Sequence, residues 1–192
     1  MPFPVHRLRP IKAEIWAVLF ENSYAKVPRG VYWSLAIRFE RFEYFEQQIG
    51  CCLSADWIRL PVRNWRALEN RSICGDFNQV EASFYTGEHD PAVYSMVRLG
   101  TRRGTCFDLE WESIVNYPGF DSSDADPRLR VATSTQAEFE GVLVPMDMIA
   151  SAPDPCERAA ELLSPFLELS AFGRPELRTN EFGAKSCTFP PM

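Results

Sequence analysis

Alternating apolar and polar positions predict that the first forty residues form two strands. Successive side chains of a strand point to opposite faces, so a period of two indicates a sheet. In residues 11–21, one face holds Ile11, Ala13, Ile15, Ala17 and Leu19, and the other holds Lys12, Glu14, Trp16, Val18 and Phe20. Residues 31–41 repeat the pattern, and the polar stretch 22–30, with Pro28 and Gly30, predicts the turn between them.

The middle of the chain predicts a meander. At Phe42 the alternation slips, which indicates a bulge or a helical turn as far as Gly50. A short strand at 57–60 and a helical turn at 62–68 follow. The strongest alternation lies in 79–86, 92–99 and 105–115. A turn at 87–91 and a glycine-bracketed loop at 100–104 separate these runs, so we expect a three-stranded antiparallel meander.

The C-terminal third predicts a loop, two strands and a helix. Residues 116–127 form the loop, and 128–133 and 138–144 are the strands. Asp154 would cap the helix, Pro155 would take its first position and Glu157 would complete a capping box. Ser164-Pro165 predicts a kink or restart before an end near 172–173.

These elements favour one α+β domain over residues 1–192. We expect a mainly antiparallel β-sheet, a meander of hairpins, with the C-terminal helix packed on one face. Residues 1–10 and 174–192 are expected to be irregular termini.

Composition narrows the class of protein. A net charge of −6 disfavours nucleic acid as a partner, because phosphate contacts need clustered Lys and Arg. The longest apolar run, 15–20, is too short for a membrane span. No signal peptide is visible, so we expect a cytoplasmic protein whose six cysteines are reduced.

The sequence predicts no cofactor and no metal. His6 and His89 are the two histidines, and the cysteines have no zinc-type spacing. The catalytic candidates are His89 and Asp90, since a carboxylate beside a histidine can orient it as a general base. The alternative is a surface turn, where Asp and Pro are common for backbone reasons.

An acidic row on one strand is the best candidate for a functional surface. Asp108, Glu110 and Glu112 alternate with Phe107, Leu109 and Trp111, so the carboxylates should share the outer face. Such a row could bind a divalent cation, act in acid–base chemistry or dock a basic partner. The alternative is a solvated face paired with arginines such as Arg98. The partner-binding set also includes Glu81, expected on a neighbouring strand, and Asp121, Asp124 and Asp126 of the loop.

The leading hypothesis is a small acidic protein-binding module that uses a sheet face and loops. Its partner is expected to be a protein with a basic surface, and an immunity or inhibitor protein that neutralises a toxin or enzyme is one concrete form. The alternative is a small hydrolase or ligand-binding domain dependent on carboxylates and His89. The oligomeric state stays open.

Overall fold

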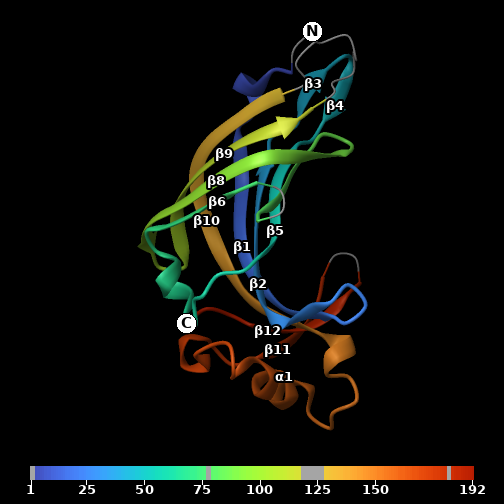
Figure 1. Cartoon of the computed structure of the whole chain (residues 1–192), viewed down its shortest axis with the longest axis vertical. Helices are drawn as coiled ribbons and strands as arrows, with labels where there is room; N and C mark the ends of the chain where they lie inside the picture. The colour runs from blue at the N-terminus through green and yellow to red at the C-terminus, as the bar shows by residue number, and fades with distance from the viewer. Residues whose placement is uncertain (1–2, 77–78, 118–127, 181–182) are drawn as a thin grey trace.

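The computed structural model describes residues 3–76, 79–117, 128–180 and 183–192. It is dominated by a twisted, mostly antiparallel sheet in the order β1-β2-β5-β7-β8-β9-β10-β12-β11 (Figure 1). The main-sheet strands are β1 (Pro10–Asn22), β2 (Val27–Phe39), β5 (Cys52–Ile58), β6 (Arg71–Gly75), β7 (Glu81–Tyr85), β8 (His89–Arg103), β9 (Cys106–Asn116), β10 (Arg128–Pro145), β11 (Glu176–Thr179) and β12 (Lys185–Phe189). A separate small hairpin comprises β3 (Phe42–Tyr44) and β4 (Gln47–Ile49).

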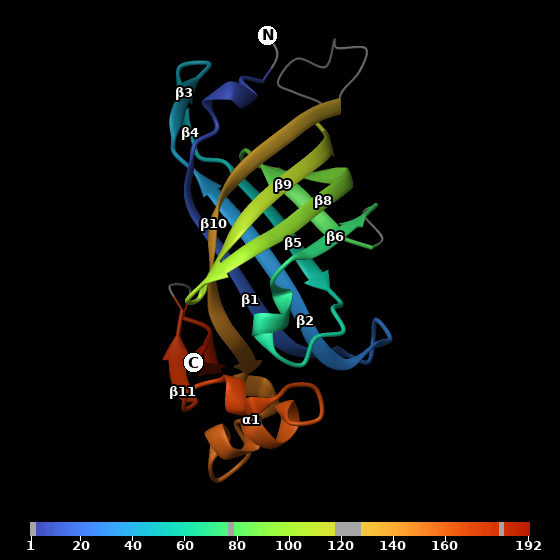
Figure 2. The ribbon, with the colours of Figure 1, turned by 90° about the vertical axis from the view of Figure 1, so that its left-hand side faces the viewer.

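The sheet closes on itself through the first strand and the last long one. β1 pairs in parallel with the second half of β10, from Glu14 opposite Glu138 to Val18 opposite Leu143. The first half of β10 pairs with β9, and its end pairs with β12. The result is a barrel bounded by β1, β2, β5, β7, β8, β9 and β10, visible from the side in Figure 2.

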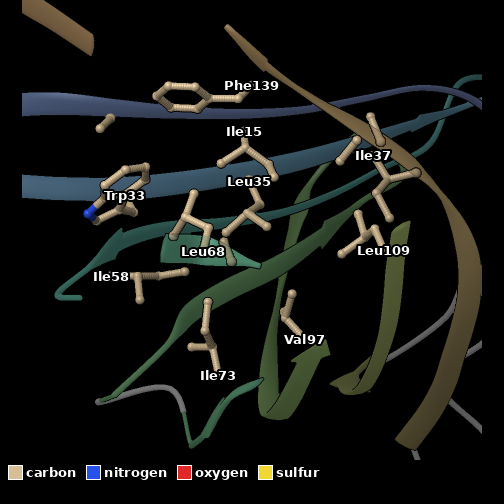
Figure 3. Close-up of a cluster of buried hydrophobic side chains, with 14 of the residues drawn as sticks. Ile15, Trp33, Leu35, Ile37, Ile58, Leu68, Ile73, Val97, Leu109 and Phe139 are labelled. Carbon is tan, nitrogen blue, oxygen red and sulfur yellow. The ribbon is translucent and has the colours of Figure 1, made fainter. Parts of the chain in front are cut away.

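Apolar side chains fill the interior of the barrel. The inward positions of the alternating strands supply Ile15, Leu35, Val97 and Leu109, each at most 1% exposed (Figure 3). The bulkiest of the buried residues are Trp33, Trp65, Trp111, Phe84, Phe107 and Phe139. Because side chains occupy this interior, the grooves that could take a partner lie on the outer face.

The first two predicted strands and the meander are confirmed. β1 matches 11–21, and β7, β8 and β9 form the antiparallel series. β2 covers 31–39 but begins at Val27, so the predicted turn at 22–30 was too long and Pro28 and Gly30 belong to the strand. Two boundaries of the meander were also wrong. β8 begins at His89, so 87–91 is not all turn, and it runs to Arg103, so the connection to β9 is a tight turn at Gly104.

Long-range pairing explains the other differences in the sheet. Residues 128–133 and 138–144 belong to one strand, β10, because β9 pairs with it without interruption as far as Glu138. Residues 42–50 form the β3–β4 hairpin, with Phe45 and Glu46 at positive φ in its turn. β6 was not predicted, and it pairs with the second half of β8.

The C-terminal segment was wrongly expected to be irregular from residue 174. β12 adds to the free edge of β10, and β11 adds to β12. The prolines that suggested an irregular tail, Pro175, Pro190 and Pro191, all lie outside these two strands.

The helix start is confirmed, but the packing of the helix is not. In α1 (Pro155–Leu163) the Asp154 carboxylate accepts from the backbone N–H groups of Cys156 and Glu157. The helix ends before Pro165, and short 3-10 turns stand elsewhere: Val5–Arg7, Trp65–Leu68, Met146–Met148 and Leu169–Ala171. α1 lies beyond one end of the barrel in both views, and packing on a sheet face is not confirmed (Figures 1 and 2). No helix in the described ranges has the length and apolarity that crossing a bilayer requires.

Candidate functional site

The acidic row lies on the outer face of β9. Phe107, Leu109 and Trp111 point inward and are at most 1% exposed, whereas Glu110 is exposed and Asp108 and Glu112 are half-buried. The alternation predicted from the sequence therefore places the three carboxylates on one surface, about 7 Å apart along the strand.

Each carboxylate of the row has an arginine partner. Asp108 accepts two hydrogen bonds from the Arg103 guanidinium, at 2.9 and 2.8 Å. Arg130 Nε lies 2.8 Å from Glu112 Oε1, and Arg98 Nη1 lies 3.8 Å from Glu110 Oε2. The cross-strand pairing with Arg98 that the sequence suggested is thus present. Exposed pairs of this kind contribute about 0–1 kcal/mol each, so the arginines can exchange partners at little cost.

Two adjoining grooves run along this row. The larger, about 670 Å³, spans β6, β8, β9 and β10 and includes Asp108 and Glu110. The smaller, about 400 Å³, includes Glu110 and Glu112. Both are lined by Arg98, Glu110 and Ser134, so the outer face of β8–β9–β10 is hollowed along the whole acidic row.

The other predicted partner-binding residues do not join the row. Glu81 pairs with Asp56 of β5, and β7 meets β8 only at residues 89–91. The expectation that Glu81 neighbours the row was wrong, because β8 separates β7 from β9. Asp121, Asp124 and Asp126 lie outside the described residues.

His89 and Asp90 point to opposite faces of β8. His89 is exposed, its Nδ1 lies 3.1 Å from Ser83 Oγ, and its ring centroid lies 4.9 Å from that of Tyr85. Asp90 lies on the same side of the strand as buried Ala92, and burial raises its pKa. Asp90 therefore cannot orient His89 as the sequence hypothesis required.

The structure also separates His89 from the acidic row. Met96, the residue paired with Glu112, follows His89 by seven positions on the same strand. At about 3.3 Å per residue this is roughly 20 Å. A shared catalytic cleft of His89 and the row is not present. The contact between His89 and Ser83 depends on the register of β7 against β8, so the local sequence pattern does not reveal it.

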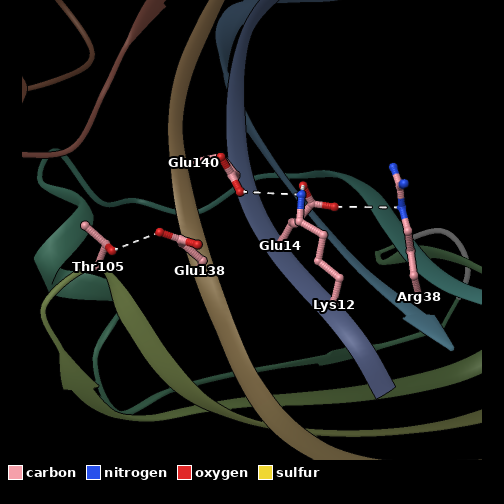
Figure 4. A network of polar contacts seen from close by, with 6 residues as sticks. All are labelled: Lys12, Glu14, Arg38, Thr105, Glu138 and Glu140. Carbon is pink, nitrogen blue, oxygen red and sulfur yellow. Dashed lines mark hydrogen bonds and ion pairs between the residues drawn. The ribbon is translucent and has the colours of Figure 1, made fainter. Parts of the chain in front are cut away.

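A second polar cluster, which the sequence did not reveal, lies where β1 meets β10 (Figure 4). Lys12 Nζ donates to Glu14 Oε1 at 2.5 Å and lies 3.9 Å from Glu140 Oε1, and Arg38 Nε lies 3.9 Å from Glu14 Oε2. The bond to Glu14 raises the pKa of Lys12. Burial raises the pKa of Glu140, and the nearby Glu14 and Glu138 add to the effect.

A β-bulge positions Glu140 in this cluster. Ile15 pairs with Phe139 and Trp16 pairs with Gly141, so Glu140 is the extra residue of β10. Gly141 has a φ of 116°, and a Cβ there would lie 2.3 Å from the Phe189 carbonyl oxygen. The glycine lets β12 approach β10, and the bulge turns Glu140 toward Lys12.

Comparisons of the chain with known protein families, curated proteins and solved structures return no match. Among the described residues, no group of three His, Cys, Asp or Glu side chains is placed to hold a metal ion.

The thiols of Cys156 on α1 and Cys187 on β12 lie 3.5 Å apart, which leads to a redox prediction. Both are free, and burial raises the pKa of Cys187 to about 12, so this thiol is protonated at neutral pH. With hydrogen peroxide, which takes one hydrogen from each thiol and is reduced to water, we expect a Cys156–Cys187 disulfide. The two cysteines are 31 residues apart, and constraining a loop of this length should stabilise the fold by about 4 kcal/mol.

Peptide mapping by mass spectrometry checks this outcome, and unfolding in urea measures the gain. Cys156→Ser should remove both the cross-linked peptide and the added stability. Exclusive cross-linking of another cysteine pair would contradict the placement of α1 against β12.

Proposed function

We propose that this chain is a protein-binding module whose acidic row docks a basic surface of a partner protein. The observation that carries the proposal is the pair of adjoining grooves on the outer face of β8–β9–β10, lined by Asp108, Glu110 and Glu112. Regular strands hold the row on a rigid support, and complementary charge favours rapid and specific encounter. The net charge of −6 also attracts a basic partner at longer range.

The arginines beside the row neutralise its carboxylates, which opposes docking of a basic partner, but they can also contribute to the interface. Arg98 and Arg130 are 56% and 70% exposed at the side chain, so both can move away when a partner's cations arrive. Arginine is also enriched in interfaces, where it can bind carboxylates and backbone carbonyls of the partner. The surface therefore carries alternating negative and positive charges instead of a uniformly negative field. Such a pattern favours one alignment of the partner over others.

A charge-reversal comparison tests the proposal. The wild-type chain and two variants serve as baits in an extract of the cells that produce it. One variant combines Glu110→Lys and Glu112→Lys in the row. The control combines Glu157→Lys and Glu161→Lys on α1, which changes the net charge equally and also removes an exposed ion pair, Arg158–Glu161.

We expect wild type and control to retain the same protein, and the row variant to bind it at least tenfold more weakly, about 1.4 kcal/mol. The affinity should fall with added salt, because the contacts are exposed charges. Equal retention of the protein by all three baits, or an equal loss in both variants, would contradict docking at the row.

An immunity or inhibitor role is the concrete form of this proposal. Its support is the modest size, the acidity and the rigid polar sheet face of the chain. If the retained protein is an enzyme, adding the wild-type chain should inhibit it, and the row variant should inhibit it less. Undiminished enzyme activity in the saturated complex would rule out this form while leaving the docking itself in place.

A further inference from the structure

A cleft of about 480 Å³ lies on the outer face of the barrel, apart from the grooves of the acidic row. Its walls come from the first two strands of the chain, β1 and β2, and from the last three, β10, β11 and β12. The residues that line it include Glu14, Trp16, Arg38, Glu140, Leu143, Arg178 and Thr188. This volume is within the usual range for small-molecule sites, about 300–1,000 Å³.

Thr188 is the feature that indicates a ligand rather than a solvated hollow. Its side chain is 2% exposed, yet its hydroxyl has no hydrogen-bond partner among the described residues. Cys187 on the same strand faces α1, where its Sγ meets Cys156, so Thr188 points to the opposite side, toward the cleft. A buried hydroxyl without a partner is costly, and a bound polar group would satisfy it.

Two arginines and two glutamates line the cleft, and Glu140 is the carboxylate with the weakest ion pair. Arg178 is occupied by Glu176, and Arg38 lies near Glu14. The nearest cation to Glu140 is the ammonium of Lys12 at 3.9 Å, which is already hydrogen-bonded to Glu14, and Arg178 also acts to lower the pKa of Glu140 although burial dominates and raises it. Glu138, beside the cleft, pairs with Glu14 across β1–β10, accepts a hydrogen bond from the Thr105 hydroxyl at 3.4 Å and forms no ion pair in the described ranges (Figure 4). The carboxylates are therefore only partly compensated.

The remaining lining is apolar and aromatic. Trp16 and Leu143 are half-buried and border the bulge that carries Glu140. An indole face attracts cations and also packs against flat apolar groups. The cleft thus combines a carboxylate, an aromatic face and an unsatisfied hydroxyl.

We propose that this cleft binds a small organic cation, an ammonium or guanidinium group on an apolar body. The cation lies against Glu140 and the face of Trp16, and its N–H donors reach the Thr188 hydroxyl. This site is separate from the docking proposed for the acidic row, so either can fail alone.

Calorimetric titration with matched probes tests the site. The probe is 2-phenylethylamine, and its neutral analogue, 2-phenylethanol, keeps the apolar body without the charge. Acetyl-arginine amide presents a guanidinium as part of a peptide. We expect the amine to bind at least tenfold more tightly than the alcohol. Tighter binding of acetyl-arginine amide than of the amine would identify an arginine side chain as the natural source of the cation.

Three variants locate the binding. Glu140→Gln, which keeps the size of the side chain, should lower the affinity for 2-phenylethylamine at least tenfold. Thr188→Val, which replaces the hydroxyl with a methyl group, should lower this affinity severalfold. It should also raise the midpoint of thermal unfolding, because the buried hydroxyl has no hydrogen-bond partner in the described ranges. Glu157→Gln on α1 is the control and should leave the affinity unchanged.

The proposal is overturned if no cationic probe binds wild type, if the alcohol binds as well as the amine, or if Glu140→Gln binds as wild type does. An unchanged unfolding midpoint in Thr188→Val would show that the Thr188 hydroxyl is not an unsatisfied group and does not contribute to the site. Proper folding of each variant is checked by its circular dichroism spectrum.

Discussion

Replacing Trp65 with alanine should lower the free energy of unfolding by about 4–5 kcal/mol, the largest effect expected from a single side chain here. Trp65 is 1% exposed, and its ring stacks on Phe139 with centroids 5.4 Å apart. Its Nε1 donates to the Ala171 carbonyl at 2.9 Å. The substitution opens a large cavity and removes one of the hydrogen bonds that tie the C-terminal segment to the barrel.

Urea unfolding followed by circular dichroism measures this loss. Trp65→Phe should cost less, since it retains most of the ring packing and loses the hydrogen bond, about 1–2 kcal/mol. Trp57→Ala is the control, because Trp57 is 42% exposed, and should cost about 1 kcal/mol. Stability of Trp65→Ala within 1 kcal/mol of wild type would mean that Trp65 does not join these two parts of the chain.

Replacing Gly141 with alanine should cost about 4 kcal/mol, from two causes that add. The φ of 116° is strained for any residue with a Cβ, and the new Cβ would lie 2.3 Å from the Phe189 carbonyl oxygen. The neighbour is backbone, so it cannot rotate away. We expect β12 to be displaced from β10, and the amides of β12 to lose protection from hydrogen exchange.

Gly87→Ala separates the two causes. Gly87 has a φ of 129°, and a Cβ there would meet nothing within 4 Å, so it carries the backbone strain alone. Its expected cost is about 1–2 kcal/mol. Equal losses of thermal stability in the two variants would show that contact with Phe189 is not what constrains Gly141.

The acidic row could be predicted from the sequence because it depends only on local alternation. Once Phe107, Leu109 and Trp111 are assigned to the core, the side of the carboxylates between them follows. The helix start at Asp154 is local in the same sense, since its capping bonds reach only two and three residues ahead.

The cleft could not be predicted, because it depends on pairings between distant strands. Glu14 and Trp16 share a face in the sequence pattern, but nothing there places them beside Glu140 and Thr188. The parallel contact of β1 with β10 and the bulge at Gly141 create that neighbourhood. β12 was missed for the same reason, as it forms only against the free edge of β10.

Site-specific photo-crosslinking most directly tests the central claim, that the outer face of β8–β9–β10 docks a protein partner. A photoreactive amino acid replaces exposed Ser134, which lines both grooves, or Tyr24, which is 98% exposed between β1 and β2. On illumination in the producing cells, we predict one discrete cross-linked protein from position 134 and none from position 24. No cross-link from position 134, or the same product from both positions, would contradict the account.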